Sequence, residues 1–322
     1  MSWLRSKGGV TMSRTKTQNT AVQKTGKKRR YKLSDFKGYL YLAPALIILV
    51  IFTLYPLVKA FIMSFMEDYN IINGSYEAIN LQNYKDLFDD TVFLKALKNT
   101  TIYVIVVVPV SIILSLIIAT LINDAAHGKA VFQTIYFLPY VTSTIAIGIV
   151  WSWIFNSNYG LLNYFLSFFG IEAIPWLNDP DYALWALIIF GIWKSLAFNI
   201  LIFLSGLSTI SQDIYQAARI DSTPRYRVFL KITVPQLRPI IVYAVLMGLI
   251  NAFKVYNEVF ALFQSTAGPA NSAITIVYYV YDKFYNSGNY GVASAAAIVL
   301  FVIILALTLI ERKATAEKED NA

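Results

Sequence analysis

The sequence predicts an all-α membrane protein with six transmembrane helices and a helical loop on the cytoplasmic side. Composition is the first reason: 57% of the 322 residues are hydrophobic and only 14% are charged, whereas soluble domains carry about 25% charged residues. The second reason is a series of six long apolar segments separated by polar loops. The third is the uneven distribution of lysine and arginine among those loops, which orients membrane proteins in the bilayer.

Composition also excludes several kinds of site. The chain has no cysteine and a single histidine, His127. Disulfides, thiolate zinc sites and cysteine nucleophiles are therefore excluded, and we expect no multi-histidine metal site, no histidine-based catalysis and no cofactor. The net charge of +8 lies mainly in the amino-terminal tail and one internal loop. We attribute it to membrane orientation and expect no nucleic-acid partner.

The first predicted region, residues 1–37, is a disordered basic tail. It contains eleven Lys or Arg residues and one acid, Asp35. A mixture of this kind cannot bury enough apolar area to fold. A mitochondrial-type targeting peptide is an alternative, and a cleaved secretory signal is disfavoured because the following apolar run is too long for one.

Residues 38–312 form the predicted transmembrane domain. A helix of about 20 apolar residues crosses a bilayer core and satisfies its own backbone hydrogen bonds there. The six predicted spans, each built on one apolar segment, are residues 39–63, 101–123, 130–155, 182–210, 239–263 and 291–311. Kinks without breaks are expected at the four prolines inside them, Pro44, Pro56, Pro109 and Pro139.

Loop charges predict which side of the membrane each loop faces. The tail and residues 210–238 are strongly basic, whereas residues 156–181 contain no lysine or arginine. Loops rich in Lys and Arg stay in the cytoplasm, so both termini, including residues 313–322, and the 210–238 loop are predicted to be cytoplasmic. The outer loops include an aromatic run at 159–177 suited to an interfacial helix, and a second aromatic segment at 265–291.

The 210–238 loop has the pattern of two short helices. Thr209 and Gln212 fit a capping box at the start of the first. Thr223 is the predicted N-cap of the second helix and Pro224 its first residue, and we expect that helix to stop at Pro235. Small and apolar residues on the first helix have no evident partner in the chain, which indicates docking to another protein. From charge alone, a solvated connector is the alternative.

The loop resembles the cytoplasmic EAA loop of ABC-importer permeases, the membrane subunits of binding-protein-dependent transporters. The matching residues are Tyr215, Ala217, Ala218, Asp221, Phe229, Ile232 and Pro235. Gln216 stands where the family has Glu, and Ser222 where it has Gly. Gln216 keeps hydrogen-bonding capacity without the charge, and Ser222 makes a positive φ at the turn less favourable.

Residues 43–65, 137–163, 191–193 and 268–269 are similar to the sugar-permease branch built like the larger maltose-transporter membrane subunit. The resemblance covers about residues 38–312 and implies the type I importer architecture in the plasma membrane of a prokaryote. The expected solute is a mono- or oligosaccharide, with glycerol phosphate or an acidic sugar as alternatives. An ion-coupled secondary transporter is the rival class, disfavoured because the sequence shows neither internal repeats nor discontinuous helices.

A permease of this kind forms a pathway and performs no reaction. The sequence has no G-x-x-x-x-G-K-[ST] phosphate loop, so ATP hydrolysis is expected in a separate ABC ATPase subunit. The resemblance implies that this subunit docks on Tyr215, Gln216, Ala217, Ala218, Asp221 and Ser222. A second related permease and an extracytoplasmic solute-binding protein complete the expected assembly.

Polar residues inside apolar segments are costly unless they face a cavity or a partner. Aligned on the motifs of maltose-type relatives, the implied solute contacts are Lys194, Ser195, Phe198, Phe253, Lys254 and Asn257. Lys254 and Glu258 are four residues apart, and a structural ion pair on one helical face is the expected arrangement.

Overall fold

The computed structural model describes residues 33–124 and 129–319 and divides the chain into two units, residues 1–53 and 54–322. The described part of the first unit is helix α1 (Leu33–Leu49), which continues into the π-helical segment η1 (Val50–Leu54). Pro44 lies inside α1 without ending it. The helix begins within the region predicted as a tail, and the rest of that tail lies outside the described residues.

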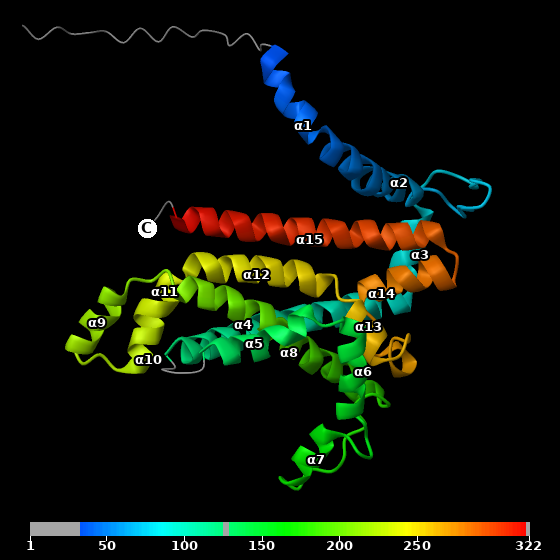
Figure 1. The fold of residues 1–322 in the computed structure, drawn as a ribbon. Helices are drawn as coiled ribbons and strands as arrows, with labels where there is room; N and C mark the ends of the chain where they lie inside the picture. The colour runs from blue at the N-terminus through cyan, green and yellow to red at the C-terminus, as the bar shows by residue number, and fades with distance from the viewer. Residues whose placement is uncertain (1–32, 125–128, 320–322) are drawn as a thin grey trace, which may run out of the picture. The chain divides into compact units, whose positions relative to one another are not determined.

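Four long helices form the framework of the second unit (Figure 1): α4 (Thr91–Asp124), α8 (Pro180–Leu207), α12 (Arg238–Phe253) and α15 (Tyr290–Glu319). By length and composition, the described residues contain four helices able to cross a membrane, or six if each of two bent helix pairs is one span. One of these four candidate membrane-spanning helices is Tyr41–Met63, which ends with α2 (Tyr55–Met63). The predicted all-α fold is confirmed. One bent pair, residues 131–154, corresponds to the predicted span 130–155, whereas the other joins residues 225–236 of the predicted loop to α12.

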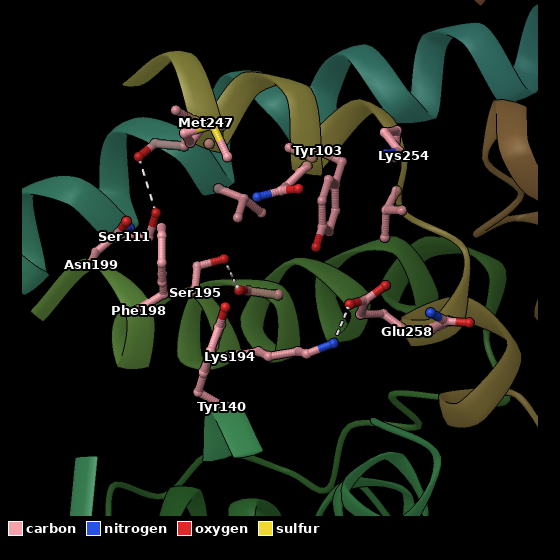
Figure 2. A pocket seen from close by; sticks show the side chains of 18 residues that line it. Tyr103, Ser111, Tyr140, Lys194, Ser195, Phe198, Asn199, Met247, Lys254 and Glu258 are labelled. Carbon is pink, nitrogen blue, oxygen red and sulfur yellow. Dashed lines mark hydrogen bonds and ion pairs between the residues drawn. The ribbon is translucent and has the colours of Figure 1, made fainter. Parts of the chain in front are cut away.

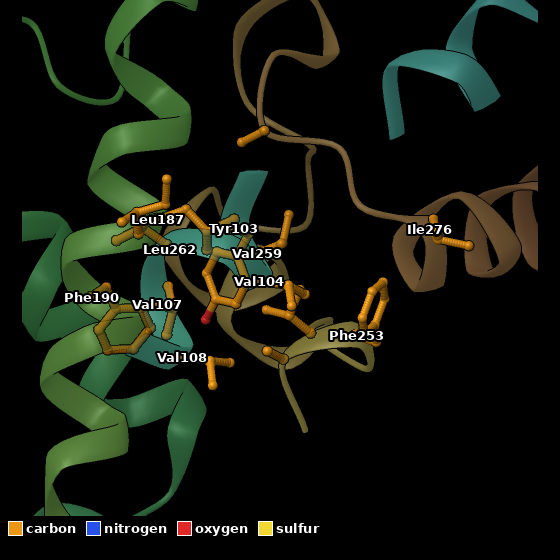
Figure 3. Packing of buried hydrophobic residues seen from close by; sticks show 14 of the residues in the cluster. Tyr103, Val104, Val107, Val108, Leu187, Phe190, Phe253, Val259, Leu262 and Ile276 are labelled. Carbon is orange, nitrogen blue, oxygen red and sulfur yellow. The ribbon is translucent and has the colours of Figure 1, made fainter. Parts of the chain in front are cut away.

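Packing of these helices follows the spacing of their apolar residues. α4 lies along α8 and α12, and α15 packs against α2, α3 (Gln82–Asp89) and α12. On α4, Tyr103, Val104, Val107 and Val108 are buried, and such i, i+3, i+4 spacing places them on one helix face. Figure 3 shows them against side chains from α8 and the segment after α12.

The predicted span 130–155 is broken, and the expectation of a kink alone was wrong. It consists of α5 (Lys129–Val141) and α6 (Thr144–Ile154), which bend by 103° at the break. Pro139 lies in the last turn of α5, where proline removes a backbone donor and crowds the preceding turn. The chain then restarts as a helix at Thr144.

The predicted span 239–263 is also discontinuous. α12 ends at Phe253, and a short helix, α13 (Asn257–Leu262), follows after a gap in the helix. Gly148 of α6 lies so close to Ala261 of α13 that an added Cβ would overlap the alanine methyl group. The glycine therefore permits the close packing that holds α13 in place, although discontinuous helices had not been expected.

α4 begins ten residues before the predicted start of its span, and this extension fixes the outer loop. Asn99 Nδ2 donates to the carbonyl oxygens of Ser272 (2.8 Å) and Ile274 (3.0 Å), and Thr100 Oγ1 accepts from the backbone N–H of Ile276 at 3.0 Å. Buried amides and hydroxyls need such partners. The loop carrying the 3₁₀ turn η3 (Pro269–Asn271) is therefore held by side chains of α4.

The remaining elements gather at the two ends of the second unit (Figure 1). One end carries α9 (Gln212–Ile220), α10 (Arg225–Val228), η2 (Phe229–Thr233), α11 (Val234–Gln236) and the carboxy-terminal end of α15. The other end carries α3, α14 (Ile276–Tyr281) and η4 (Asp282–Asn286), and α7 (Leu161–Ser167) lies below α6 in this view. α7 falls within the predicted interfacial run 159–177, and its aromatic Tyr164 and Phe165 are exposed. The predicted 313–322 tail starts inside α15.

Candidate functional site

A cavity of about 510 Å³ lies among α4, α5, α8, α12 and α13 (Figure 2). Ligand pockets are concave and combine apolar walls with a few placed polar groups. The polar lining here comprises Tyr103, Ser111, Tyr140, Lys194, Ser195, Asn199, Asn251, Lys254, Asn257 and Glu258. Over the described part of the chain, no group of His, Asp and Glu residues is arranged to hold a metal ion.

Five of the six solute contacts implied by the sequence line this cavity. They are Lys194, Ser195, Phe198, Lys254 and Asn257. Phe253 does not line it, because its side chain is 5% exposed and packs in the hydrophobic core. The structure thus brings residues of α8 and of the segment after α12 to one wall, and their contact with a solute stays a prediction.

An ion pair joins two walls of the cavity. Lys194 Nζ lies 2.6 Å from Glu258 Oε1 and 2.7 Å from Thr144 Oγ1. These three residues come from α8, α13 and the first residue of α6. The pair neutralises two charges that would be costly alone inside a membrane, and it connects the two helices that begin after breaks to an unbroken span.

The expected pair between Lys254 and Glu258 was wrong. Residues four apart share a face only on a continuous helix, and the helix is interrupted between Phe253 and Asn257. Glu258 therefore turns to Lys194, 64 positions away in the sequence. Lys254 is exposed at the cavity, and its ammonium group makes no hydrogen bond or ion pair with another described residue.

Aromatic residues shape the remaining wall. Phe198 stacks on Tyr140 with ring centroids 5.4 Å apart and planes 20° apart. Tyr103 lies with its hydroxyl directly against Gly191, where any Cβ would overlap it. Ser195 Oγ donates to the Gly191 carbonyl oxygen at 2.8 Å, so its proton is engaged within α8.

Several residues that line the cavity were not among the solute contacts predicted from the motif alignment. Asn199 and Asn251 carry a sequence signal, because amides are rare inside apolar segments. Tyr103 and Tyr140 carry none, since tyrosine is common throughout this chain. Their place at the cavity follows only from how α4 and α5 pack on α8.

The second candidate site is the loop between α8 and α12. Its first helix begins at Gln212 with Ser211 as N-cap, and Ser211 Oγ accepts from the Asp213 N–H at 3.3 Å. The predicted capping box was wrong, because Thr209 Oγ1 instead donates to the Gly206 carbonyl oxygen at the end of α8.

The second helix of the loop also differs from the prediction. Pro224, not Thr223, occupies the cap position, and α10 begins at Arg225. Pro235 does not end the helix, because it lies in the first turn of α11, where a missing N–H costs little. The helical path from Arg225 runs to Gln236 and bends by 72° into α12.

The turn between the two helices requires a left-handed backbone. Ser222 has φ +51°, a conformation that costs a non-glycine residue about 1 kcal/mol or more. The Thr223 N–H donates to the Ala218 carbonyl oxygen at 2.9 Å and closes the end of α9. The unfavourable positive φ expected at Ser222 is therefore present.

The two faces of α9 have different surroundings. Ala218 is 6% exposed, and the Tyr215 hydroxyl lies 3.2 Å from Thr233 Oγ1 in η2. These residues face their own chain, so the small size of Ala218 serves packing inside the loop, and its contact with a partner stays a prediction. The outward residues are Gln216, Ala217, Asp221, Ser222 and Ile220, the last being 83% exposed.

Known proteins with similar sequences belong to membrane transport systems. Residues 93–313 match the family described as binding-protein-dependent transport system inner membrane component. The chain is 31% identical to the trehalose/maltose transport system permease protein MalF of Thermococcus litoralis, over 86% of this chain and 92% of that protein. It is 34% identical to the lactose transport system permease protein LacF of Rhizobium radiobacter, over 86% of this chain and 93% of that protein. It is 32% identical to the arabinooligosaccharides transport system permease protein AraP of Bacillus subtilis, over 91% of this chain and 93% of that protein.

Solved structures share the fold. A bacterial ABC transporter involved in import of the acidic polysaccharide alginate superposes with a TM-score of 0.75 at 24% identity, over 88% of this chain and 96% of that chain. The bacterial alginate ABC transporter in complex with an alginate pentasaccharide-bound periplasmic protein superposes with a TM-score of 0.73 at 25% identity, over 86% of this chain and 93% of that chain. Together with the family match across most of the sequence, these similarities show that the chain belongs to the family of inner-membrane components of binding-protein-dependent transport systems.

Proposed function

We propose that this chain is the permease subunit of an ATP-driven importer for a mono- or oligosaccharide. The observation that carries the proposal is the cavity lining, in which the stacked Phe198 and Tyr140 rings lie with the exposed amides Asn251 and Asn257. Flat aromatic surfaces and amide donors and acceptors complement the apolar faces and hydroxyl groups of sugars. The sugar permeases among its relatives support the same solute class.

An acidic sugar or glycerol phosphate is the second candidate solute. Lys254 favours it, because this cation is exposed at the cavity and has no acidic partner among the described residues. Lys194 does not, because its charge is already neutralised by Glu258. The similarity to an alginate importer is compatible with this candidate.

Partner subunits follow from what the chain leaves uncovered. Asn251, Lys254 and Asn257 are exposed polar residues beside apolar spans, and inside a membrane they need a second wall. A second related permease would supply it. The outward residues of α9, including Gln216, Ala217 and Asp221, form the surface proposed for a separate ABC ATPase subunit, and an extracytoplasmic solute-binding protein would engage the opposite end.

Orientation in the membrane is a further proposal, with both termini and the α9–α11 loop in the cytoplasm. The basic loop 210–238 and the carboxy-terminal end of α15 lie at the same end of the second unit (Figure 1), and basic loops are retained in the cytoplasm. Reporters fused after Ala322 should read cytoplasmic, and reporters inserted near Asn73 or Asn286 should read external. A cytoplasmic signal at Asn286 would contradict the topology.

Transport itself is tested in proteoliposomes containing this chain with its ATPase, second permease and binding protein. We expect ATP-dependent uptake of at least one probe among glucose, maltose, lactose, arabinotriose, galacturonate disaccharide and glycerol 3-phosphate. Lys254→Gln should reduce uptake of the acidic probes at least tenfold if the solute is acidic, and should leave neutral sugars near wild type. Uptake driven by an ion gradient without ATP would identify a secondary transporter and contradict the proposal.

A further inference from the structure

The segment after the outer loop carries a row of tyrosines on one helical face. α14 and η4 form a continuous helical stretch in which Tyr278, Tyr281 and Tyr285 are spaced by three and four positions, the spacing of neighbours on a helix surface. The rings of Tyr281 and Tyr285 are 5.1 Å apart between centroids. Tyr285 is 72% exposed, Tyr281 is half-buried and Tyr278 is buried.

This row continues onto the chain segment that lines the cavity. The Tyr256 ring lies 5.1 Å from Tyr281 and 5.7 Å from Phe260 between centroids. Tyr256 is located in the gap between α12 and α13, and its neighbours Val255 and Asn257 both line the cavity. A chain of aromatic contacts therefore leads from an exposed ring at one end of the second unit to Tyr256, which is not itself a lining residue but lies in the chain segment that lines the cavity.

The opposite face of the same helix holds it in place. The Tyr279 hydroxyl donates to Asp90 Oδ2 at 2.8 Å, and Lys283 Nζ lies 2.9 Å from the same oxygen. Burial opposes the charge of Asp90, but these bonds from Lys283 and Tyr279 hold its pKa below the ordinary value. Tyr279 and Lys283 thus anchor α14 and η4, and Tyr281 and Tyr285 are left to face away from this anchor.

We propose that Tyr285, Tyr281 and Tyr256 form an aromatic track along which a carbohydrate chain passes from the extracytoplasmic surface into the cavity. This inference rests on the proposed function. A sugar ring presents an apolar C–H face that packs on a flat aromatic ring, and tyrosine offers such a surface with few rotatable bonds and a polar tip. Successive rings of one kind let the solute exchange one contact for the next equivalent contact.

An aromatic belt at the membrane interface is the other use of exposed tyrosines. Belt residues surround the perimeter and face lipid. Here the Tyr281 ring contacts Tyr256, whose two sequence neighbours, Val255 and Asn257, line the cavity. This contact with the cavity-lining segment is the feature that favours a solute as the occupant.

The test uses the same proteoliposomes, with maltose and arabinotriose as probes. Tyr281→Leu and Tyr285→Ala should lower the initial uptake rate about tenfold, which corresponds to about 1.4 kcal/mol in the barrier. Tyr281→Phe keeps the ring and should retain most of the rate. Thermal midpoints and ATP hydrolysis without binding protein should match wild type for all three variants, because neither residue belongs to the anchor at Asp90.

Tyr164→Ala is the matched control, since Tyr164 of α7 is 63% exposed and lies outside the row. It should transport at the wild-type rate. Wild-type uptake by Tyr281→Leu and Tyr285→Ala, or an equal loss with Tyr281→Phe and with Tyr164→Ala, would overturn the track while leaving the sugar importer intact. If the wild-type complex imports neither probe nor any other carbohydrate, the proposed function fails and the track with it.

Discussion

Replacing Lys194 with methionine should lower both the thermal midpoint of the purified complex and its transport rate. The change removes the cation that lies 2.6 Å from Glu258, whose side chain is only 17% exposed. Leaving one charged partner of such a pair without compensation costs about 1–3 kcal/mol for a partly buried group. Glu258→Gln should have a similar effect, because it leaves the charge of Lys194 without an acidic partner. Thermal unfolding of the detergent-purified complex measures both losses.

The double variant Lys194→Met with Glu258→Met separates structure from solute contact. Removing both charges should restore most of the thermal midpoint, since neither group is then left unpaired. If Lys194 only positions α13, transport recovers with stability; if it contacts the solute, the folded double variant remains inactive. Lys254→Met is the control and should not lower the midpoint, because Lys254 is exposed and unpaired. Strict additivity of the two single losses would show that the pair contributes no coupling energy.

Ala217→Trp should abolish uptake and weaken retention of the ATPase while leaving the amount of membrane-inserted protein unchanged. Ala217 is exposed on the outer face of α9, so the added indole meets a partner and nothing within its own chain. Overpacking a fitted interface costs about 1–3 kcal/mol. Ile220→Arg, at a residue 83% exposed, should act in the same way. Co-purification of the ATPase and solute uptake are measured side by side.

Ala218→Trp provides the contrast within the same helix. Because Ala218 is buried against its own chain, this variant should disorganise the loop and reduce the amount of folded protein as well as ATPase binding. Asp221→Arg, on the exposed turn, should resemble Ala217→Trp, and Gln216→Glu should be tolerated. Full ATPase retention and full uptake in both Ala217→Trp and Asp221→Arg would mean that the loop is a solvated connector.

Much of the cavity could be anticipated from the sequence. Lys194, Ser195 and Phe198 fall on one α8 segment, and Lys254 and Asn257 fall on one short stretch after α12. Motif spacing therefore placed them without knowledge of the packing. Phe253 lies outside the cavity lining, because its neighbours at the helix end turn toward the cavity while its own ring turns into the core. That difference depends on the exact residue at which α12 ends, which local propensity does not determine.

By itself the sequence determined the membrane class, the number of apolar segments and the two-helix loop between α8 and α12, because hydropathy and local helical patterning act over a few turns of chain. Only the tertiary structure decided that α5 and α6 are separate helices, that Glu258 pairs with Lys194, and that Ala218 faces inward. These features depend on contacts between residues far apart in the chain. A broken helix is tolerated where neighbouring elements satisfy the freed backbone groups, and a buried charge takes the partner that packing brings within reach.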